Sequence, residues 1–334
     1  MNPVEGEYWR ARDDGRIDCL LCPKRCLLAE GQSGSCKVRV ARAGALVLPY
    51  FAAITSLAVD PIEKKPLYHF LPGSSVFSAG FVGCNLHCPF CQNWEIAQTE
   101  SVPTRRVGPD ELVRAALDAR VPSIAFTYSE PLVHFEYVKA AMLLARRAGL
   151  RTVLVTNGCV NPEPAYELLS LADATNVDLK CWSPKDYRSV LGGERDAVLS
   201  FIKASAAACH TEVTTLVVPG LSDASVDIRE IARFLASISR DLPYHLSAYH
   251  PAWKRRDPPT DPSLLASLAK VARGELRYVY VGNIAGEDSD TRCPSCAAKV
   301  IRRRGYETNA SGLRVSPGRT ECAACGGILP IVGL

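Results

Sequence analysis

Three cysteines with a short and regular spacing offer the clearest chemistry in this chain. Cys84, Cys88 and Cys91 form a C-x3-C-x2-C motif directly after an apolar, strand-like run. A closed iron–sulfur cluster normally takes four cysteine thiolates. Three cysteines can therefore hold three irons of a cubane cluster and leave the fourth iron open to an exchangeable ligand. A three-thiolate zinc site is the alternative, because zinc also accepts cysteine ligands.

A second group of cysteines lies near the N-terminus. Its four members are Cys19, Cys22, Cys26 and Cys36. Four thiolates form a closed site, and both zinc and an auxiliary iron–sulfur cluster accept four cysteines. We expect this site to stabilise the fold, with an electron relay as the alternative. The spacing does not choose between the two metals.

A third group of cysteines lies near the C-terminus. Two C-x2-C pairs, separated by a hairpin-sized span, are Cys293 with Cys296 and Cys322 with Cys325. This spacing predicts a zinc ribbon. The run Arg302–Arg304 within it predicts a solvated edge, with an acidic partner or RNA as the alternative contact.

Composition restricts the class of protein. The chain has 334 residues and 14 cysteines, 11 of which fall in the three tight clusters. Clusters with such short gaps are typical of metal ligation in a reducing compartment and not of a disulfide framework. The net charge of +4 is too balanced to predict nucleic-acid or membrane binding by itself. With no apolar signal core and no membrane-length stretch, we expect a cytoplasmic protein without a membrane partner.

Repeated strand and helix patterns must position the first motif. The strand-like runs are 76–82, 123–128, 152–156, 174–179, 212–218 and 244–249, with helical periodicity between them. These β-then-α units predict an α/β fold, a partial (β/α)6 TIM-type barrel. We expect an N-terminal cysteine-knot extension over 1–74, the barrel over 75–257, and a C-terminal helix, strand and zinc-ribbon-like module over 258–334.

Polar and hinge residues follow each of these six strands. The segments at the strand ends are the three-cysteine loop, Ser129-Glu130-Pro131, Asn157-Gly158, Asp178-Leu179-Lys180, Pro219-Gly220 and Tyr249-His250-Pro251. In a barrel of parallel strands the reacting groups collect at the carboxyl ends. We therefore expect these segments to share one mouth. The charged stretch 60–70, which contains two prolines, predicts a solvated turn, with a substrate or cofactor contact as the alternative.

The motifs together resemble a known family. The cysteine loop, Tyr128-Ser129-Glu130, Thr156-Asn157-Gly158, Asp178-Leu179-Lys180 and Val217-Val218-Pro219 look like the motifs of the pyruvate-formate-lyase activating-enzyme branch of radical S-adenosylmethionine (SAM) proteins. With both flanking cysteine groups included, the whole chain looks most like the radical SAM member of the AmmeMemoRadiSam system.

This resemblance implies a cofactor pair and a reaction. Cys84, Cys88 and Cys91 would hold a 4Fe-4S cluster whose free iron binds SAM. An electron from a reduced flavodoxin or ferredoxin would split SAM into methionine and a 5′-deoxyadenosyl radical. That radical would abstract hydrogen from a substrate, so the resemblance implies an oxidoreductase of the activating-enzyme type. The extra modules favour a protein or RNA substrate over a small metabolite.

The resemblance also implies a set of SAM contacts, with Asp178 and Lys180 as the catalytic pair. Phe90 and Val217 to Pro219 are expected to contact the adenine of SAM, and Asn157 its ribose. Ser129 and Glu130 are expected to contact the amino group of the methionine part. Asp178 and Lys180 are expected to contact its carboxylate, directly or through a cation, and His245 is expected to lie close to SAM.

Departures from the family pattern leave other hypotheses open. The family's Gly-Gly-Glu is here Tyr128-Ser129-Glu130, which lacks the backbone freedom of two glycines. The lone cysteines Cys159, Cys181 and Cys209 are expected to pack as small buried side chains. One alternative keeps the cluster but transfers a methyl or aminocarboxypropyl group from SAM. Another is a zinc-stabilised RNA or protein adaptor without enzymatic activity.

Overall fold

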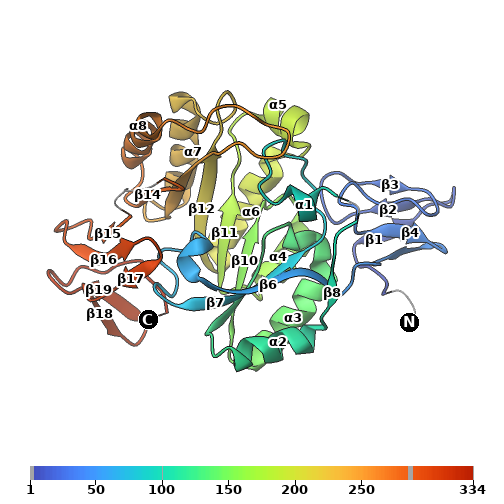
Figure 1. Ribbon diagram of the computed structural model, residues 1–334, viewed down its shortest axis with the longest axis horizontal. Helices are drawn as coiled ribbons and strands as arrows, with labels where there is room; N and C mark the ends of the chain where they lie inside the picture. The colour runs from blue at the N-terminus through green and yellow to red at the C-terminus, as the bar shows by residue number, and fades with distance from the viewer. Residues whose placement is uncertain (1–3, 100, 285–288, 334) are drawn as a thin grey trace.

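A parallel β-sheet forms the centre of the molecule in the computed structural model, which describes residues 4–99, 101–284 and 289–333 (Figure 1). The sheet order is β14-β13-β12-β11-β10-β9-β7-β6-β8. The strands are β6 (Ala53–Pro61), β7 (Ser75–Phe81), β8 (Arg105–Arg106), β9 (Ser123–Thr127), β10 (Arg151–Thr156), β11 (Ala174–Asp178), β12 (His210–Val217), β13 (Tyr244–Ala248) and β14 (Val279–Gly282). The six strands expected from the sequence are confirmed to within two residues at each end.

The sheet extends beyond those six strands on both sides. β14, expected in the C-terminal module, pairs in parallel with β13. On the other side, β6 pairs antiparallel with β7, and β8 pairs antiparallel with β6. The strand count of six is therefore wrong, because the segment around Val279 belongs to the same sheet. Within the described residues, β14 and β8 are the two unjoined edges of this sheet.

The longer helices pack on one face of the sheet, and the short helices α1 and α5 lie in loops between strands. They are α1 (Trp94–Ala97), α2 (Pro109–Asp118), α3 (Phe135–Arg147), α4 (Pro162–Leu169), α5 (Pro184–Asp186), α6 (Arg195–Ala208), α7 (Ser225–Ile238) and α8 (Pro262–Arg273), with short helical turns at Ile62–Lys64, Pro131–His134 and Tyr187–Leu191. Helix α7 buries Ile228, Ile231 and Leu235, which recur at helical spacing. Helix α8 begins where the Asp261 carboxylate accepts the Ser263 amide at 2.7 Å.

Alternating side chains of the strands divide the core in two. Ile124 and Phe126 of β9 belong to the large apolar core beneath the helices. Ala125 between them faces the opposite side of the sheet, where it packs with Leu67 and Phe70. The stretch 60–70 therefore lies against the sheet and is not a solvated turn. Its apolar residues bury there because they meet the early residues of the parallel strands.

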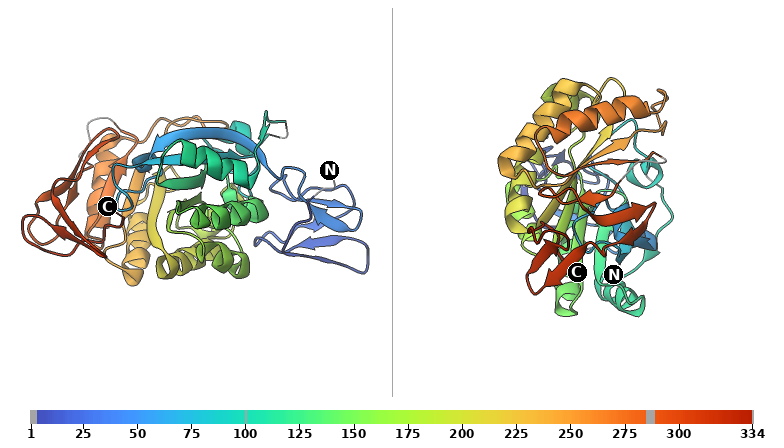
Figure 2. Two further views of the ribbon diagram at one scale, coloured as in Figure 1. Left: turned by 90° about the horizontal axis from the view of Figure 1, so that it is seen from below. Right: turned by 90° about the vertical axis from the view of Figure 1, so that its left-hand side faces the viewer.

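Two small modules flank this sheet at opposite ends of the molecule (Figure 2). The N-terminal module contains β1 (Trp9–Ala11), β2 (Ile17–Cys19), β3 (Leu27–Leu28), β4 (Val40–Arg42) and β5 (Ala45–Val47). A buried ion pair joins it to α3, with Arg39 Nη1 2.9 Å from Glu136 Oε1. The Asn161 amide, past the carboxyl end of β10, also bonds the Leu21 carbonyl at 3.0 Å. This module therefore lies at the carboxyl edge of the sheet.

The C-terminal module contains β15 (Thr291–Arg292), β16 (Lys299–Arg304), β17 (Glu307–Asn309), β18 (Leu313–Ser316) and β19 (Arg319–Cys322). The Val332 amide bonds the His69 carbonyl at 2.8 Å, so this module docks on the 60–70 stretch. Arg303 bonds the Tyr68 carbonyl at 2.7 Å and places its guanidinium 4.3 Å from the Tyr68 ring. The predicted solvated edge is therefore wrong for Arg303, although Arg302 and Arg304 are exposed. Strand alternation turns the middle arginine inward.

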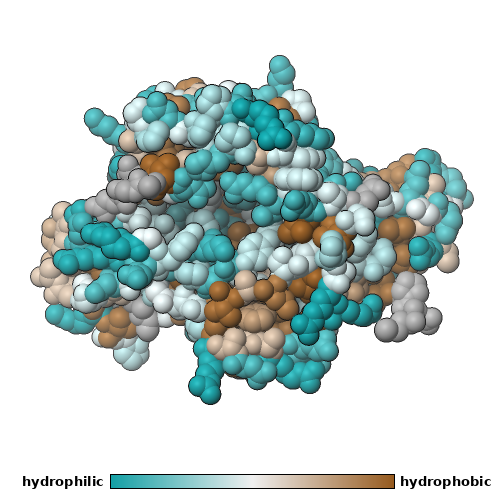
Figure 3. All heavy atoms as spheres, in the orientation of Figure 1, coloured by the Kyte–Doolittle hydropathy of each residue, from teal (hydrophilic) through white to brown (hydrophobic). Residues whose placement is uncertain are grey.

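The surface shown in Figure 3 mixes hydrophilic and hydrophobic residues, with apolar residues gathered below its centre near β7 and α2. Among the described residues, no helix combines the length and apolar character needed to cross a membrane.

Candidate active site at the carboxyl edge of the sheet

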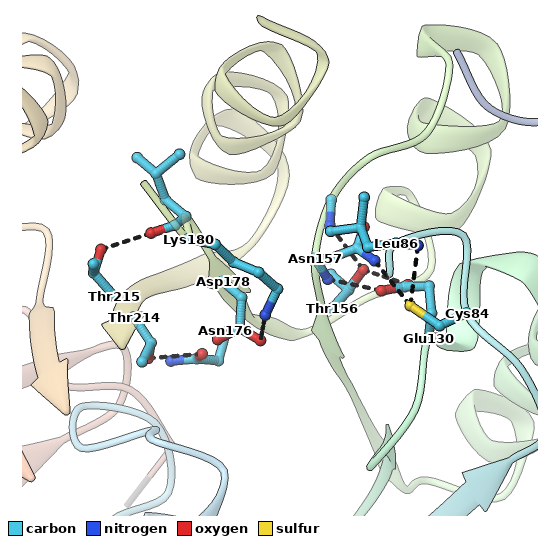
Figure 4. Close-up of polar contacts among 12 residues, drawn as sticks. Cys84, Leu86, Glu130, Thr156, Asn157, Asn176, Asp178, Lys180, Thr214 and Thr215 are labelled. Carbon is cyan, nitrogen blue, oxygen red and sulfur yellow. Dashed lines mark hydrogen bonds and ion pairs between the residues drawn. The ribbon is translucent and has the colours of Figure 1, made fainter. Parts of the chain in front are cut away.

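The three-cysteine loop leaves β7 and turns across the carboxyl edge of the sheet. Gly83 makes this turn with a φ of +81°, which favours glycine. The sulfur of Cys84 then accepts two N–H groups, from the Leu86 backbone at 3.3 Å and from Asn157 Nδ2 at 3.6 Å. Cys88 is buried. The segments that follow β7 and β10, which are far apart in the sequence, therefore meet at the Cys84 sulfur (Figure 4).

The spacing of the sulfurs distinguishes the three cysteine groups. Among the described residues, only the C-terminal group has ligand atoms that all lie within 4.8 Å of one another. Thiolates that share one zinc ion would be about 4 Å apart, because Zn–S bonds are about 2.3 Å long. The sulfurs of Cys84, Cys88 and Cys91 do not all lie within 4.8 Å of one another, which suits thiolates that each bind a different iron. The residues present therefore fit the cluster implied by the motif better than they fit zinc.

Glu130 holds the loops after β9 and β10 together. Its buried carboxylate accepts Thr156 Oγ1 at 2.6 Å, the Asn157 amide at 2.8 Å and the Leu132 amide at 3.0 Å. Burial raises the pKa of Glu130 to about 7, although these three donors oppose the shift. Three of the four acceptor positions of the carboxylate are thus occupied by the protein. This residue positions Asn157 beside Cys84, and one acceptor position on Oε2 remains.

The residues before Glu130 take the backbone form that glycine would give. Tyr128 has a φ of +69°, which is uncommon for a residue with a side chain. The Ser129 amide bonds back to the Thr127 carbonyl at 2.9 Å and closes a tight turn. The Tyr128 hydroxyl bonds the Asp60 carboxylate, and its ring lies 4.3 Å from Lys65 Nζ. These contacts hold the strained turn in place of a glycine pair.

Ser129 Oγ is buried and has no hydrogen-bond partner among the residues that the structure describes. A buried hydroxyl without a partner is costly. Its place in the turn between β9 and Glu130 is where the resemblance expects the amino group of SAM. This orphaned atom fits a polar ligand at the carboxyl edge of the sheet.

Asp178 and Lys180 follow β11 as a bonded pair. Lys180 Nζ lies 3.0 Å from Asp178 Oδ2, and Figure 4 shows this pair apart from the group around Cys84. Burial raises the pKa of the Cys88 thiol to about 11, and nearby Lys180 opposes that shift. Lys180 therefore favours the thiolate that a metal requires. The expected role of Asp178 and Lys180 toward the carboxylate of SAM stays a prediction.

The remaining predicted contacts divide into two sets. Phe90 and Val217 are buried, and the Thr260 hydroxyl bonds the Val217 carbonyl at 2.6 Å at the end of β12. His245 instead lies near the start of β13, where its Nε2 is 2.6 Å from Glu212 Oε2. The centroid of its ring is 4.7 Å from that of Tyr68, in an edge-to-face arrangement. His245 thus contacts residues on the side of the sheet that holds the C-terminal module. Its expected role beside SAM stays a prediction.

The lone cysteines are buried or half-buried, and two histidines near the cysteine loop make structural hydrogen bonds. Cys159 and Cys181 are buried, and Cys209 is half-buried. His87 bonds Ser35 Oγ at 2.8 Å and Gln98 Oε1 at 3.0 Å, and His134 bonds the Val82 carbonyl at 2.7 Å. These histidines brace the cysteine loop against its neighbours.

Sequence reasoning missed Asn85. Its buried side chain donates to the Cys159 carbonyl at 2.6 Å and accepts Asn157 Nδ2 at 2.9 Å. It therefore fixes the amide that also reaches Cys84. The only sequence signal was an asparagine next to a ligand cysteine, which does not reveal such a network.

The four C-terminal cysteines are drawn together as one site. Cys293 and Cys325 have sulfurs 3.6 Å apart, and the sulfurs of Cys296 and Cys322 are 3.7 Å apart. Tetrahedral ligands about 2.3 Å from zinc would be separated by about 3.8 Å. This geometry fits a single four-coordinate metal ion.

Comparisons with known proteins agree with this geometry. The family model described as "Radical SAM superfamily" matches residues 80–235. The chain is 36% identical over 335 residues to the "Uncharacterized protein MJ0808" of Methanocaldococcus jannaschii, covering 98% of this chain and 99% of that protein. It is 28% identical over 193 residues to the pyruvate formate-lyase-activating enzyme of Staphylococcus epidermidis, covering 52% of this chain and 75% of that enzyme.

Solved structures share the fold at low identity. The crystal structure of Streptococcus suis SuiB bound to S-adenosylmethionine matches with a TM-score of 0.52 and 14% identity, over 67% of this chain and 53% of that chain. This chain thus spans about half the length of that structure. The chain therefore carries a domain of the radical SAM superfamily over residues 80–235 and is homologous to pyruvate formate-lyase-activating enzymes.

Proposed function

We propose that this chain binds a 4Fe-4S cluster through Cys84, Cys88 and Cys91, and SAM at the same site, and abstracts hydrogen from a substrate. When bound, this pair supplies reductive cleavage of SAM to a 5′-deoxyadenosyl radical. The observation that carries the proposal is the convergence of Leu86 N–H and Asn157 Nδ2 on the Cys84 sulfur at the carboxyl edge of the sheet. Hydrogen bonds to cluster sulfurs tune the reduction potential.

The protein's own groups then orient the ligand. The free Ser129 hydroxyl and the remaining acceptor of Glu130 suit an ammonium group, because both can accept its N–H bonds. Lys180 suits a carboxylate, either directly or with Asp178 sharing a cation. We assign Asp178 and Lys180 the catalytic positions on this basis. Phe90 and the end of β12 would line the adenine side.

The finer assignment follows from the flanking modules. An N-terminal four-cysteine module and a C-terminal module favour the AmmeMemoRadiSam group, whose radical SAM member has both. We propose zinc in the C-terminal site, because the sulfur separations match a tetrahedral ion. A reduced flavodoxin or ferredoxin is the proposed electron donor, and a protein or RNA the proposed substrate, in the cytoplasm.

Anaerobic reconstitution tests the proposal. The iron- and sulfide-loaded protein is reduced with dithionite, mixed with SAM, and its products are separated by liquid chromatography with mass detection. We expect 5′-deoxyadenosine and methionine from the wild type and from Cys209→Ala, which changes a cysteine outside the site. We expect neither product from Cys88→Ala.

Other products would identify the competing reactions. Methylthioadenosine would indicate aminocarboxypropyl transfer, and S-adenosylhomocysteine would indicate methyl transfer. Either one, in place of 5′-deoxyadenosine, would refute hydrogen abstraction while keeping the SAM site. A colourless protein that binds zinc alone would favour the adaptor.

A further inference from the structure

The four N-terminal cysteines form a second thiolate group close to the first. Cys19 and Cys36 are buried, and Cys22 and Cys26 are half-buried. Gly34 lies between two of them, since a side-chain carbon on Gly34 would be 3.7 Å from Cys36 Sγ and 3.8 Å from Cys26 Sγ. The Ser35 amide donates to Cys26 Sγ at 3.4 Å. The backbone of Gly34 and Ser35 thus lies close to the sulfurs of Cys26 and Cys36.

The sulfur spacing of the N-terminal cysteines can be compared with that of the C-terminal cysteines, for which we propose zinc. In the part of the chain that the structure describes, the C-terminal cysteines are gathered within 4.8 Å, and no three of the N-terminal cysteines are. The sulfurs of Cys84, Cys88 and Cys91 likewise do not all lie within 4.8 Å of one another. A four-iron cluster requires such spacing, because each thiolate binds a different corner of the cube. One zinc ion requires the close spacing.

The N-terminal group also lies directly against the loop of Cys84. The Cys36 carbonyl and the Val38 side chain occupy the space beside Gly83, one residue before Cys84. Asn85, one residue after Cys84, interacts with the Cys22 thiol as well as with Asn157. Ser35 Oγ bonds His87 Nε2 at 2.8 Å. Three contacts within five residues, at Gly83, Asn85 and His87, therefore connect the two cysteine groups.

We propose that Cys19, Cys22, Cys26 and Cys36 hold a second, redox-active 4Fe-4S cluster, and that it is seated beside the site at Cys84. The cluster takes one electron from a flavodoxin- or ferredoxin-type donor, which is oxidised by one electron in the same step. The identity of this metal site does not depend on the proposed SAM reaction. Its importance as a redox neighbour rests on that proposed function.

Metal counting and electron paramagnetic resonance (EPR) test this proposal on the full chain. The proteins are the wild type, the triple variant Cys84→Ala/Cys88→Ala/Cys91→Ala and the double variant Cys19→Ala/Cys22→Ala, with Cys209→Ala as the control. Each is reconstituted anaerobically with iron, sulfide and zinc. Iron, sulfide and zinc are then counted, and EPR spectra are recorded after dithionite reduction, with and without SAM.

The expected result is about eight irons per wild-type chain and about four in each cluster variant, with about one zinc throughout. The triple variant should keep a reduced-cluster EPR signal that SAM does not change. The proposal is overturned if the triple variant binds about two zinc ions and no iron. If the double variant does not fold, the wild-type counts decide between eight irons and four irons with two zinc ions.

The two proposals fail separately. Iron in the triple variant without 5′-deoxyadenosine from the wild type would refute the proposed function and keep the second cluster. Zinc at the N-terminus with 5′-deoxyadenosine from the wild type would refute the second cluster and keep the proposed function.

Discussion

The backbone carbonyl of Cys36 occupies the space that a side chain on Gly83 would need. Gly83 also has a φ of +81°, so both its conformation and its surroundings require glycine. One residue thus joins the N-terminal cysteine module to the loop of Cys84. Changes at this contact should disturb both metal sites together.

Gly83→Ala should lower iron loading and stability. The new methyl group meets backbone atoms of Cys36, which cannot move aside as a flexible side chain could. We expect a loss of at least about 2 kcal/mol in the free energy of unfolding, measured with urea, and less iron per chain. Gly149→Ala is the matched control, since Gly149 has a φ of +78° and nothing within 4 Å. Equal losses in both variants would show that backbone strain alone matters.

Asn157→Ala should change the redox properties of the cluster without unfolding the protein. The variant loses the N–H group directed at Cys84 Sγ and the bond to Asn85 Oδ1. We expect a more negative midpoint potential and SAM cleavage slower by about tenfold, as for other outer-shell ligands. An EPR redox titration checks the potential. Exposed Asn309→Ala should match the wild type, and an unchanged potential in Asn157→Ala would contradict the assignment.

His134→Gln should alter how stability depends on pH. Burial lowers the pKa of His134 to about 4, below its usual value near 6.5. The unfolded chain therefore binds a proton that the folded chain refuses, and stability falls as pH drops from 6.5 towards 4. The share of His134 is about 3 kcal/mol over that range. Glutamine keeps a donor for the Val82 carbonyl but does not titrate. The free energy of unfolding of this variant, measured with urea, should therefore lose about 3 kcal/mol less than the wild type between pH 6.5 and 4.

Glu130→Gln should remove the opposite pH dependence. The pKa of Glu130 is raised to about 7 by burial, so its protonated form stabilises the fold below pH 4.5. This stabilisation, about 3 kcal/mol, is lost as pH rises from 4.5 through 7. In the wild type, Glu130 and His134 therefore oppose each other between pH 4.5 and 6.5. In Glu130→Gln, the free energy of unfolding measured with urea should therefore rise more steeply with pH between 4.5 and 6.5 than in the wild type. An unchanged slope would contradict a raised pKa for the buried Glu130 carboxyl.

Arg303→Ala should weaken the docking of the C-terminal module. Its guanidinium bonds the Tyr68 carbonyl at 2.7 Å, Thr291 Oγ1 at 2.8 Å and the Ser289 carbonyl at 3.0 Å. Truncation leaves buried acceptors unsatisfied and costs about 2 to 4 kcal/mol. The neighbouring Arg302→Ala, at an exposed position, should change stability by less than about 0.5 kcal/mol. Urea unfolding of the zinc-loaded proteins compares them, and equal effects would argue against the docking role.

The sequence by itself determined the cysteine motifs and the positions of six strands of the central sheet. Cysteine spacing and apolar periodicity are local properties of the chain, so they can be recognised from the sequence alone. This is why the positions of the six strands and the grouping of the four C-terminal cysteines were both predictable. The family pattern at Tyr128-Ser129-Glu130 was also visible, and the positive φ of Tyr128 explains how the turn persists without glycine.

Tertiary structure decided which of these residues meet. The burial of Arg303, the pairing of β14 with β13 and the amide of Asn157 on Cys84 all depend on segments distant in the chain. The sulfur spacing that separates the N-terminal group from the C-terminal one is likewise a distance in space. Local pattern carries no information on such distances, because packing between remote segments sets them.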